Sequence, residues 1–187
     1  LSEYVTTVEV TNLASPWLPV SYPAVSVNGL QGNWTAAPYN RTVLSQAATT
    51  QGQNYEVITN VPRPTLEQIR AREAGGPDQR DGTTALPEEI APIVGDLALE
   101  VTAETTNDYD ALVALQSWFR GAEFRYSLDA PVEEGFDGSG TDAVARFLEV
   151  REGYCIHYAS AFALMARTLG MPSRIVVGYL PGSATSD

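Results

Sequence analysis

The chain has 187 residues, of which 44% are hydrophobic, so it is long and apolar enough to fold around a sizeable core. Its formal net charge of −12 argues against a basic surface that binds nucleic acid or an anionic membrane through phosphate groups. A single cysteine excludes an internal disulfide, and no apolar run reaches the roughly 18 residues of a membrane span.

Residues 1–62 are predicted to form a β-rich N-terminal region. The segments 4–10 and 54–59 have the composition of strands and a partial alternation of polar and apolar residues. Turn-forming residues recur between these two segments, and prolines end the pattern. We find no internal repeat in this region or in the rest of the chain.

The segment 63–106 is predicted to be a helical linker region. Thr65 begins a capping-box pattern, which predicts a short helix over residues 65–74. Pro87 suits the first turn of a helix, and the apolar residues after it keep helical spacing. A second helix is therefore predicted over residues 87–104.

The segment 107–187 is predicted to contain the remaining helices. Asn107 or its neighbour can cap a helix that a glycine ends at residue 121. A short extended segment follows at 124–127, and another helix is predicted to start at residue 141 or 142. The region therefore combines helices with short strands.

The most informative stretch surrounds Cys155, the only cysteine of the chain. Cys155 is predicted to begin an apolar helix that ends at Gly170, and the β-branched segment 174–180 is predicted to be a strand. Unpaired backbone N–H groups and the positive end of the dipole stabilise a thiolate at a helix N-terminus. The alternative is that Cys155 is a small buried hydrophobic residue with no chemical role.

The sequence around Cys155 resembles the core of the transglutaminase-like superfamily. The shared parts occur in the same order, namely Gly153-Tyr154-Cys155, a helix of small residues, Gly170-Met171-Pro172, and a strand that starts at Arg174. A weaker similarity reaches back to residue 107 and, with the segment 62–70, resembles the bacterial membrane-anchored transglutaminase-like proteins.

The resemblance implies an α+β fold with a papain-like core, of which 107–187 is the first, mainly helical half. It also implies a Cys-His-Asp triad in which Cys155 attacks a glutamine carboxamide, ammonia leaves, and an amine or water resolves the thioester. Gly153 and Tyr154 are implied to border the substrate. No cofactor and no metal are implied.

Trp118 and Tyr126 are further candidates, as hydrogen-bond donors to the oxyanion that develops during attack. The simpler interpretation is that both are core aromatic residues. The acidic segment 129–137 lacks the spacing of a calcium loop, which favours a solvated loop. Cys155 and His157 alone are too few ligands for a structural zinc ion.

His157, the only histidine, is a poor candidate for the triad base. Two residues along a helix correspond to a rotation of about 200°, so Cys155 and His157 point to roughly opposite sides. The resemblance places the triad histidine and aspartate on strands after the segment 175–179. We therefore expect a truncated piece of a longer protein that holds the nucleophile but is inactive by itself.

The resemblance also implies an extracytoplasmic domain of a membrane-anchored bacterial protein that acts on protein or peptide substrates. The sequence predicts neither the substrate nor the oligomeric state. Two alternatives stay open. The same nucleophile suits a cysteine peptidase or amidase that cleaves cell-wall or protein amides, and a degenerate fold suits a non-catalytic binding or assembly module.

Overall fold

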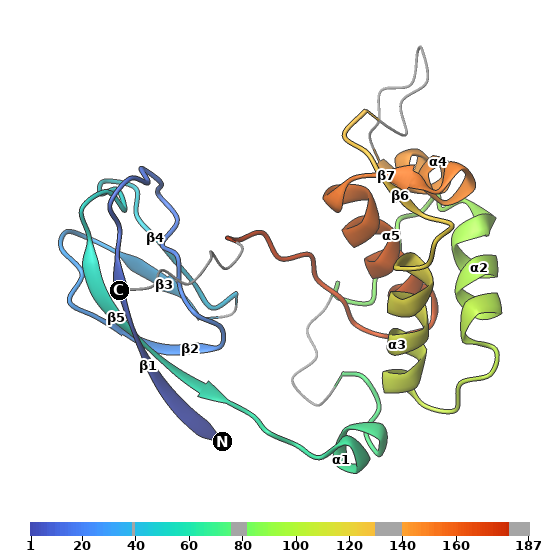
Figure 1. Cartoon of the computed structure of the whole chain (residues 1–187), viewed down its shortest axis with the longest axis horizontal. Coiled ribbons are helices and arrows are strands. Elements are labelled where there is room, and N and C mark those ends of the chain that lie inside the picture. The colour runs from blue at the N-terminus through green and yellow to red at the C-terminus, as the bar shows by residue number, and fades with distance from the viewer. Residues whose placement is uncertain (39, 76–81, 130–139, 180–187) are drawn as a thin grey trace. The chain divides into compact units, whose positions relative to one another are not determined.

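The computed structural model describes the residues 1–38, 40–75, 82–129 and 140–179 (Figure 1). The chain divides into two compact units, one formed by Leu1–Pro64 with the segment from Val177 onward, and the other formed by Thr65–Val176. Among the described residues, no helix combines the length and the apolar character needed to cross a membrane.

The described residues of the N-terminal unit form five strands (Figure 1). Their bounds are β1 Ser2–Glu9, β2 Ala24–Asn28, β3 Thr35–Ala37, β4 Thr42–Leu44 and β5 Asn54–Val61. An antiparallel sheet has the order β1-β5-β2, and β3 pairs with β4 in a separate two-stranded ladder. The prediction of strands near both ends of this region is confirmed by β1 and β5.

Strand β5 is central because it pairs with β1 on one side and with β2 on the other, and its alternate residues are buried. Tyr55, Val57 and Thr59 face the core of the unit, as the period of two in a half-buried strand requires. The Tyr55 hydroxyl donates a hydrogen bond to the carbonyl of Pro19 at 2.5 Å, which satisfies this buried polar group.

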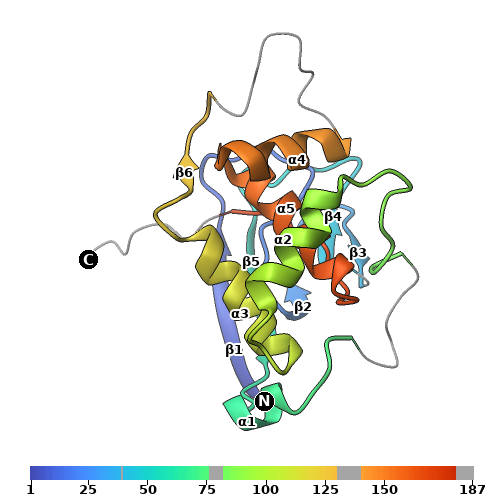
Figure 2. The same cartoon turned by 90° about the vertical axis from the view of Figure 1, so that its right-hand side faces the viewer.

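The second unit is a small helical bundle (Figure 2). Its described residues also include one short parallel strand pair. The helices are α1 Leu66–Arg70, α2 Pro92–Thr102, α3 Asp108–Phe119, α4 Gly140–Val150 and α5 Cys155–Thr168, and the strands are β6 Arg125–Tyr126 and β7 Glu152–Gly153. Helix α5 contacts α2, α3 and α4. The core that they share is apolar and consists of Val94, Ala98, Leu115, Phe119, Val144, Phe147, Leu148, Ala161 and Met165.

Two of the predicted helix starts are confirmed by their caps. Asn107 accepts a hydrogen bond from the backbone N–H of Asp110 at 2.9 Å and begins α3. Thr65 and Gln68 form both bonds of a capping box and begin α1. Hydrogen bonds of this kind can be predicted from the sequence because both partners lie within one helical turn.

The predicted start of α2 at Pro87 is wrong, because the helix begins at Pro92. Proline disfavours the helical conformation of the residue before it, and Ala91 is indeed extended, with φ −63° and ψ 135°. A helix from residue 87 would have to pass through Ala91. Pro92 instead occupies the first turn, where its missing N–H costs nothing.

The predicted strand over 174–180 is also wrong for the residues that the structure describes. Residues 174–179 have no regular secondary structure, and the side chains of Val176 and Val177 are 86% and 94% exposed. A β-branched sequence favours an extended chain, but a strand forms only when its backbone pairs with a neighbour. No described strand pairs with this segment.

Candidate active site

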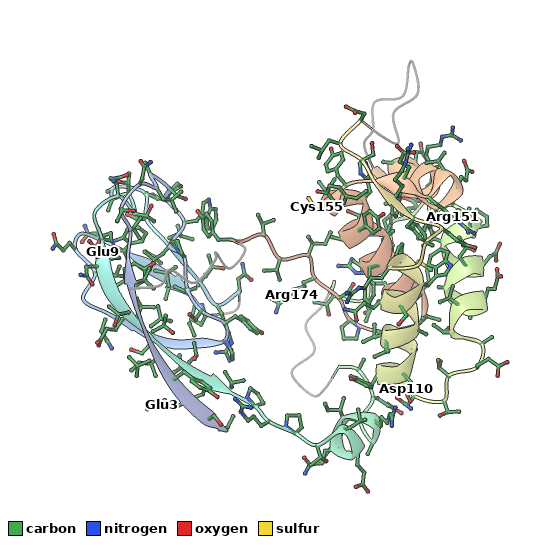
Figure 3. All side chains as sticks on the ribbon, in the orientation of Figure 1. Glu3, Glu9, Asp110, Arg151, Cys155 and Arg174 are labelled. Carbon is green, nitrogen blue, oxygen red and sulfur yellow. The ribbon has the colours of Figure 1, made fainter. Side chains whose placement is uncertain are left out.

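Cys155 lies where the sequence predicts it, at the first residue of α5. Its side chain is exposed, and it follows the N-cap residue Tyr154, whose φ of −124° and ψ of −177° are extended (Figure 3). The first backbone N–H groups of a helix have no partner within that helix. They place partial positive charge beside Cys155, which favours an anion there.

The start of α5 is fixed by a short strand pair. Tyr126 of β6 lies opposite Gly153 of β7, and the N–H of Ser127 donates to the Gly153 carbonyl at 2.8 Å. The backbone turns from α4 into β7 at Arg151, which adopts a positive φ of 56°. The residues that precede α5 are therefore fixed by strand pairing and do not form an unpaired loop.

Gly153 is buried and is needed for the packing of two side chains of the protein itself. A Cβ atom at this position would lie 2.9 Å from Cδ2 of Phe147 and 3.1 Å from Nδ1 of His157. Both distances are shorter than ordinary van der Waals contacts. The glycine thus allows Phe147 and His157 to approach the backbone, and its role at the substrate stays a prediction.

Replacing Gly153 with alanine is expected to lower the free energy of unfolding by about 1–3 kcal/mol, because the added methyl group overpacks this contact. Urea unfolding followed by circular dichroism measures the change. Gly95→Ala is the matched control: Gly95 lies within α2, no atom lies within 4 Å of the added Cβ, and alanine favours a helix. Equal effects of the two substitutions would contradict the packing argument.

His157 is buried, in contrast to the exposed Cys155. The residue is 7% exposed, and its ring stacks on Phe147 of α4, with ring centroids 5.9 Å apart. Its Nδ1 accepts a hydrogen bond from the backbone N–H of Tyr154 at 3.3 Å, so this nitrogen carries no proton. The two side chains therefore lie in different environments, in agreement with the rotation expected along the helix. The bond from the Tyr154 N–H was not predicted from the sequence, although His157 has the spacing of a capping box.

The burial of His157 is expected to make the free energy of unfolding depend on pH. Burial lowers the pKa of His157 below its ordinary value of 6.5, because the imidazolium would lose hydration. The unfolded chain then binds the proton more readily than the folded chain. The stabilisation is therefore complete above pH 6.5 and is lost as the pH falls through the lower, folded pKa, by at most about 1.4 kcal/mol per pH unit.

Urea unfolding between pH 5 and pH 7.5 measures this loss of stability. His157→Gln, which cannot titrate, is expected to show a flatter profile, and an unchanged profile would contradict the assignment.

Trp118 belongs to an aromatic cluster at the end of α3. Its ring centroid lies 5.0 Å from that of Phe119 and 4.8 Å from that of Phe124, and the guanidinium of Arg151 lies 5.7 Å from it. These contacts are those of a packed aromatic side chain with a cation over its face. Hydrogen bonding from Trp118 to an oxyanion stays a prediction.

Tyr126 lies closer to the Cys155 turn. Its ring is 62% exposed and stacks on that of Tyr158 at 6.3 Å, and Tyr158 is one turn along α5 from Cys155. The structure therefore brings Tyr126, Tyr158 and the cysteine to one end of α5, while Trp118 packs within the core cluster. The role of the Tyr126 hydroxyl stays a prediction.

The part of the chain that the structure describes contains no candidate metal site. There, no group of three or more histidine, cysteine, aspartate or glutamate side chains is arranged to hold an ion. Of the acidic segment 129–137, only Asp129 lies within the described residues.

Two family models match different parts of the chain. Residues 95–187 match the model described as the transglutaminase-like superfamily, and residues 1–66 match the one described as the TgpA N-terminal domain.

Two curated proteins are similar to parts of the chain. The chain is 28% identical over 134 residues to the uncharacterized protein YebA of Bacillus subtilis, a match that covers 69% of the chain and 18% of YebA. It is 35% identical over 98 residues to a protein-glutamine gamma-glutamyltransferase of Pseudomonas aeruginosa, covering 52% of the chain and 14% of that enzyme. The chain thus spans less than a fifth of either relative.

Two solved structures share the fold. The crystal structure of the periplasmic domain of TgpA from Pseudomonas aeruginosa superposes with a TM-score of 0.68 and 24% identity, over 98% of this chain and 59% of that one. The same domain bound to ethylmercury gives a TM-score of 0.63 at 24% identity, over 91% of this chain and 56% of that one. The predicted α+β fold is confirmed.

Proposed function

Since residues 95–187 of this chain belong to the transglutaminase-like superfamily, we propose that it carries the nucleophile of an extracytoplasmic cysteine acyltransferase. The observation that carries the proposal is the exposed position of Cys155 at the first residue of α5. The Pseudomonas relative named a protein-glutamine gamma-glutamyltransferase supports glutamine as the acyl donor. The periplasmic domain that shares the fold supports a site outside the cytoplasmic membrane. Anchoring of the parent protein to that membrane is part of the proposal.

The proposed reaction has two covalent steps. The Cys155 thiolate attacks the carbonyl carbon of a glutamine side chain, and the negative charge moves to the oxygen. When this tetrahedral intermediate collapses, the C–N bond breaks, the nitrogen takes a proton and leaves as ammonia, and a thioester remains. An amine then attacks the thioester and forms an amide, or water attacks and forms glutamate, and the thiolate is released.

Electrostatic stabilisation in both steps comes from the start of α5. The unpaired N–H groups of the first turn favour the thiolate and the oxyanion that develops beside it. Tyr126 is proposed to contact a substrate at this end of the helix, and its exposure and its stacking on Tyr158 support this role. Gly153 and Tyr154, which directly precede the nucleophile, border the same position.

The general base is proposed to lie outside these 187 residues. The only histidine of the chain is His157, and its Nδ1 accepts the Tyr154 N–H inside the unit. A triad base must contact the nucleophile and have a free nitrogen to take its proton. A histidine and an aspartate from the remainder of the parent protein would supply these functions.

The test is product analysis with the full-length protein that contains this chain. A glutamine peptide is incubated with and without a primary amine, and mass spectrometry and an ammonia assay follow the products. Ammonia release with amine incorporation supports acyl transfer, and glutamate formation alone supports hydrolysis at the same thiol. Cleavage of the peptide backbone would instead support the peptidase alternative, and no reaction of any kind would support a binding module.

A further inference from the structure

Helix α5 begins without the usual capping side chain. Serine, threonine, aspartate and asparagine are the residues that normally accept a bond from the first turn, and the N-cap here is Tyr154. The N–H of His157, which such a side chain would accept, donates instead to the backbone carbonyl of Tyr154 at 2.9 Å. The strand pair holds Gly153, and the N–H of Tyr154, the next residue, needs an acceptor of its own.

His157 occupies the position that supplies this group. It is the third residue of α5, where glutamine or glutamate closes a capping box by accepting the N–H of the N-cap residue. The same chain shows the ordinary version at α1, where the N–H of Thr65 donates to Oε1 of Gln68 at 2.9 Å. At α5 the N–H of Tyr154 donates to Nδ1 of His157 at 3.3 Å.

Three neighbouring residues pack around the His157 imidazole. Phe147 of α4 stacks on it, the ring of Tyr154 meets it edge-on at 4.4 Å, and the missing Cβ of Gly153 leaves room for it. A glutamine side chain has several rotatable bonds, whereas this buried ring has two. The ring therefore ties α4 and the residues before Cys155 to the first turn of α5.

We infer that His157 is a positioning residue: its imidazole takes the place of a capping-box carboxamide and fixes the residue immediately before Cys155. It makes no contact with substrate and takes no proton from the thiol. This inference rests on the proposed function only in naming Cys155 as the nucleophile. Small displacements of a reacting atom cost reaction rate, so a loosened α5 start would slow Cys155 chemistry.

The test compares two substitutions that both fill the buried space. His157→Gln keeps an acceptor for the Tyr154 N–H, and His157→Leu is apolar and has none. Ile156→Ala, at a neighbouring residue whose side chain is 55% exposed, is the control. In the full chain, hydrogen exchange at the Tyr154 amide is measured by NMR, and the pH–rate profile of Cys155 alkylation by iodoacetamide is measured beside it.

With His157→Leu, exchange at Tyr154 is expected to be at least tenfold faster and alkylation at least threefold slower. Global stability is expected to fall, because the Tyr154 N–H loses its acceptor, and the glutamine variant is expected to restore it. With His157→Gln, both rates are expected to return to within about threefold of the native chain. The inference is overturned if the leucine variant leaves Tyr154 exchange unchanged, or if the glutamine variant fails to restore it. Amide exchange does not involve the thiol. Normal exchange results, with no acyl transfer by the full-length protein that contains this chain, would therefore contradict the proposed function alone.

Discussion

Replacing Phe147 with alanine is expected to lower the free energy of unfolding of the helical unit by about 3–5 kcal/mol. The Phe147 side chain is 0% exposed, and its ring lies 6.1 Å from that of Phe119 and 4.8 Å from that of Tyr158, between centroids. Truncation would remove these contacts and leave a cavity between α3, α4 and α5 that the helices can fill only in part.

Hydrogen exchange with mass spectrometry measures this change, because peptides from α3, α4 and α5 report the helical unit separately from the strands of the N-terminal unit. Leu99→Ala is the control, since Leu99 lies on α2 and is 64% exposed, and its effect is expected to be within about 0.5 kcal/mol. A loss below 1 kcal/mol for Phe147→Ala would mean that the surrounding helices collapse onto the site. A second consequence follows from the stacking on His157, because the start of α5 is expected to exchange faster in this variant.

The parts of the structure that sequence analysis predicts well are those governed by neighbours along the chain. Asn107 caps α3 and Thr65 caps α1 through bonds that span three residues. The position of Cys155 at a helix start follows in the same way from the glycine before it and the apolar residues after it. In each case the information lies within one or two turns.

The parts that sequence analysis misses depend on distant partners. Residues 174–179 have the composition of a strand, but their conformation depends on a backbone that pairs with them. The role of His157 depends on Phe147, which lies ten residues earlier on another helix and leaves the imidazole no exposed position. Helical rotation separates His157 from Cys155, yet it does not reveal that the ring turns back to the Tyr154 amide.

Replacing Cys155 with alanine is expected to reduce acyl transfer by the full-length protein at least 10⁴-fold, because removal of the nucleophile from a triad leaves only binding and electrostatic stabilisation. The fold is expected to survive, since the Cys155 side chain is exposed and such substitutions change stability by about 0.5 kcal/mol or less. Amine incorporation into a glutamine peptide measures the rate. Hydroxylamine-sensitive labelling of the protein by the acyl donor measures the thioester, and it is expected to vanish in the same variant.

This substitution separates the role of the thiol from that of its surroundings. Leu99→Ala, with its exposed side chain on α2, is expected to keep both the rate and the thioester label. Retention of more than about one-hundredth of the native rate by Cys155→Ala would rule out covalent catalysis at this residue, since a lost nucleophile costs far more than that. A lost rate with a retained label would place the acyl group on another side chain. If the variant loses both the acyl-transfer rate and the thioester label, and unfolds at the same urea concentration as the native chain, the thioester is assigned to Cys155, the first residue of α5.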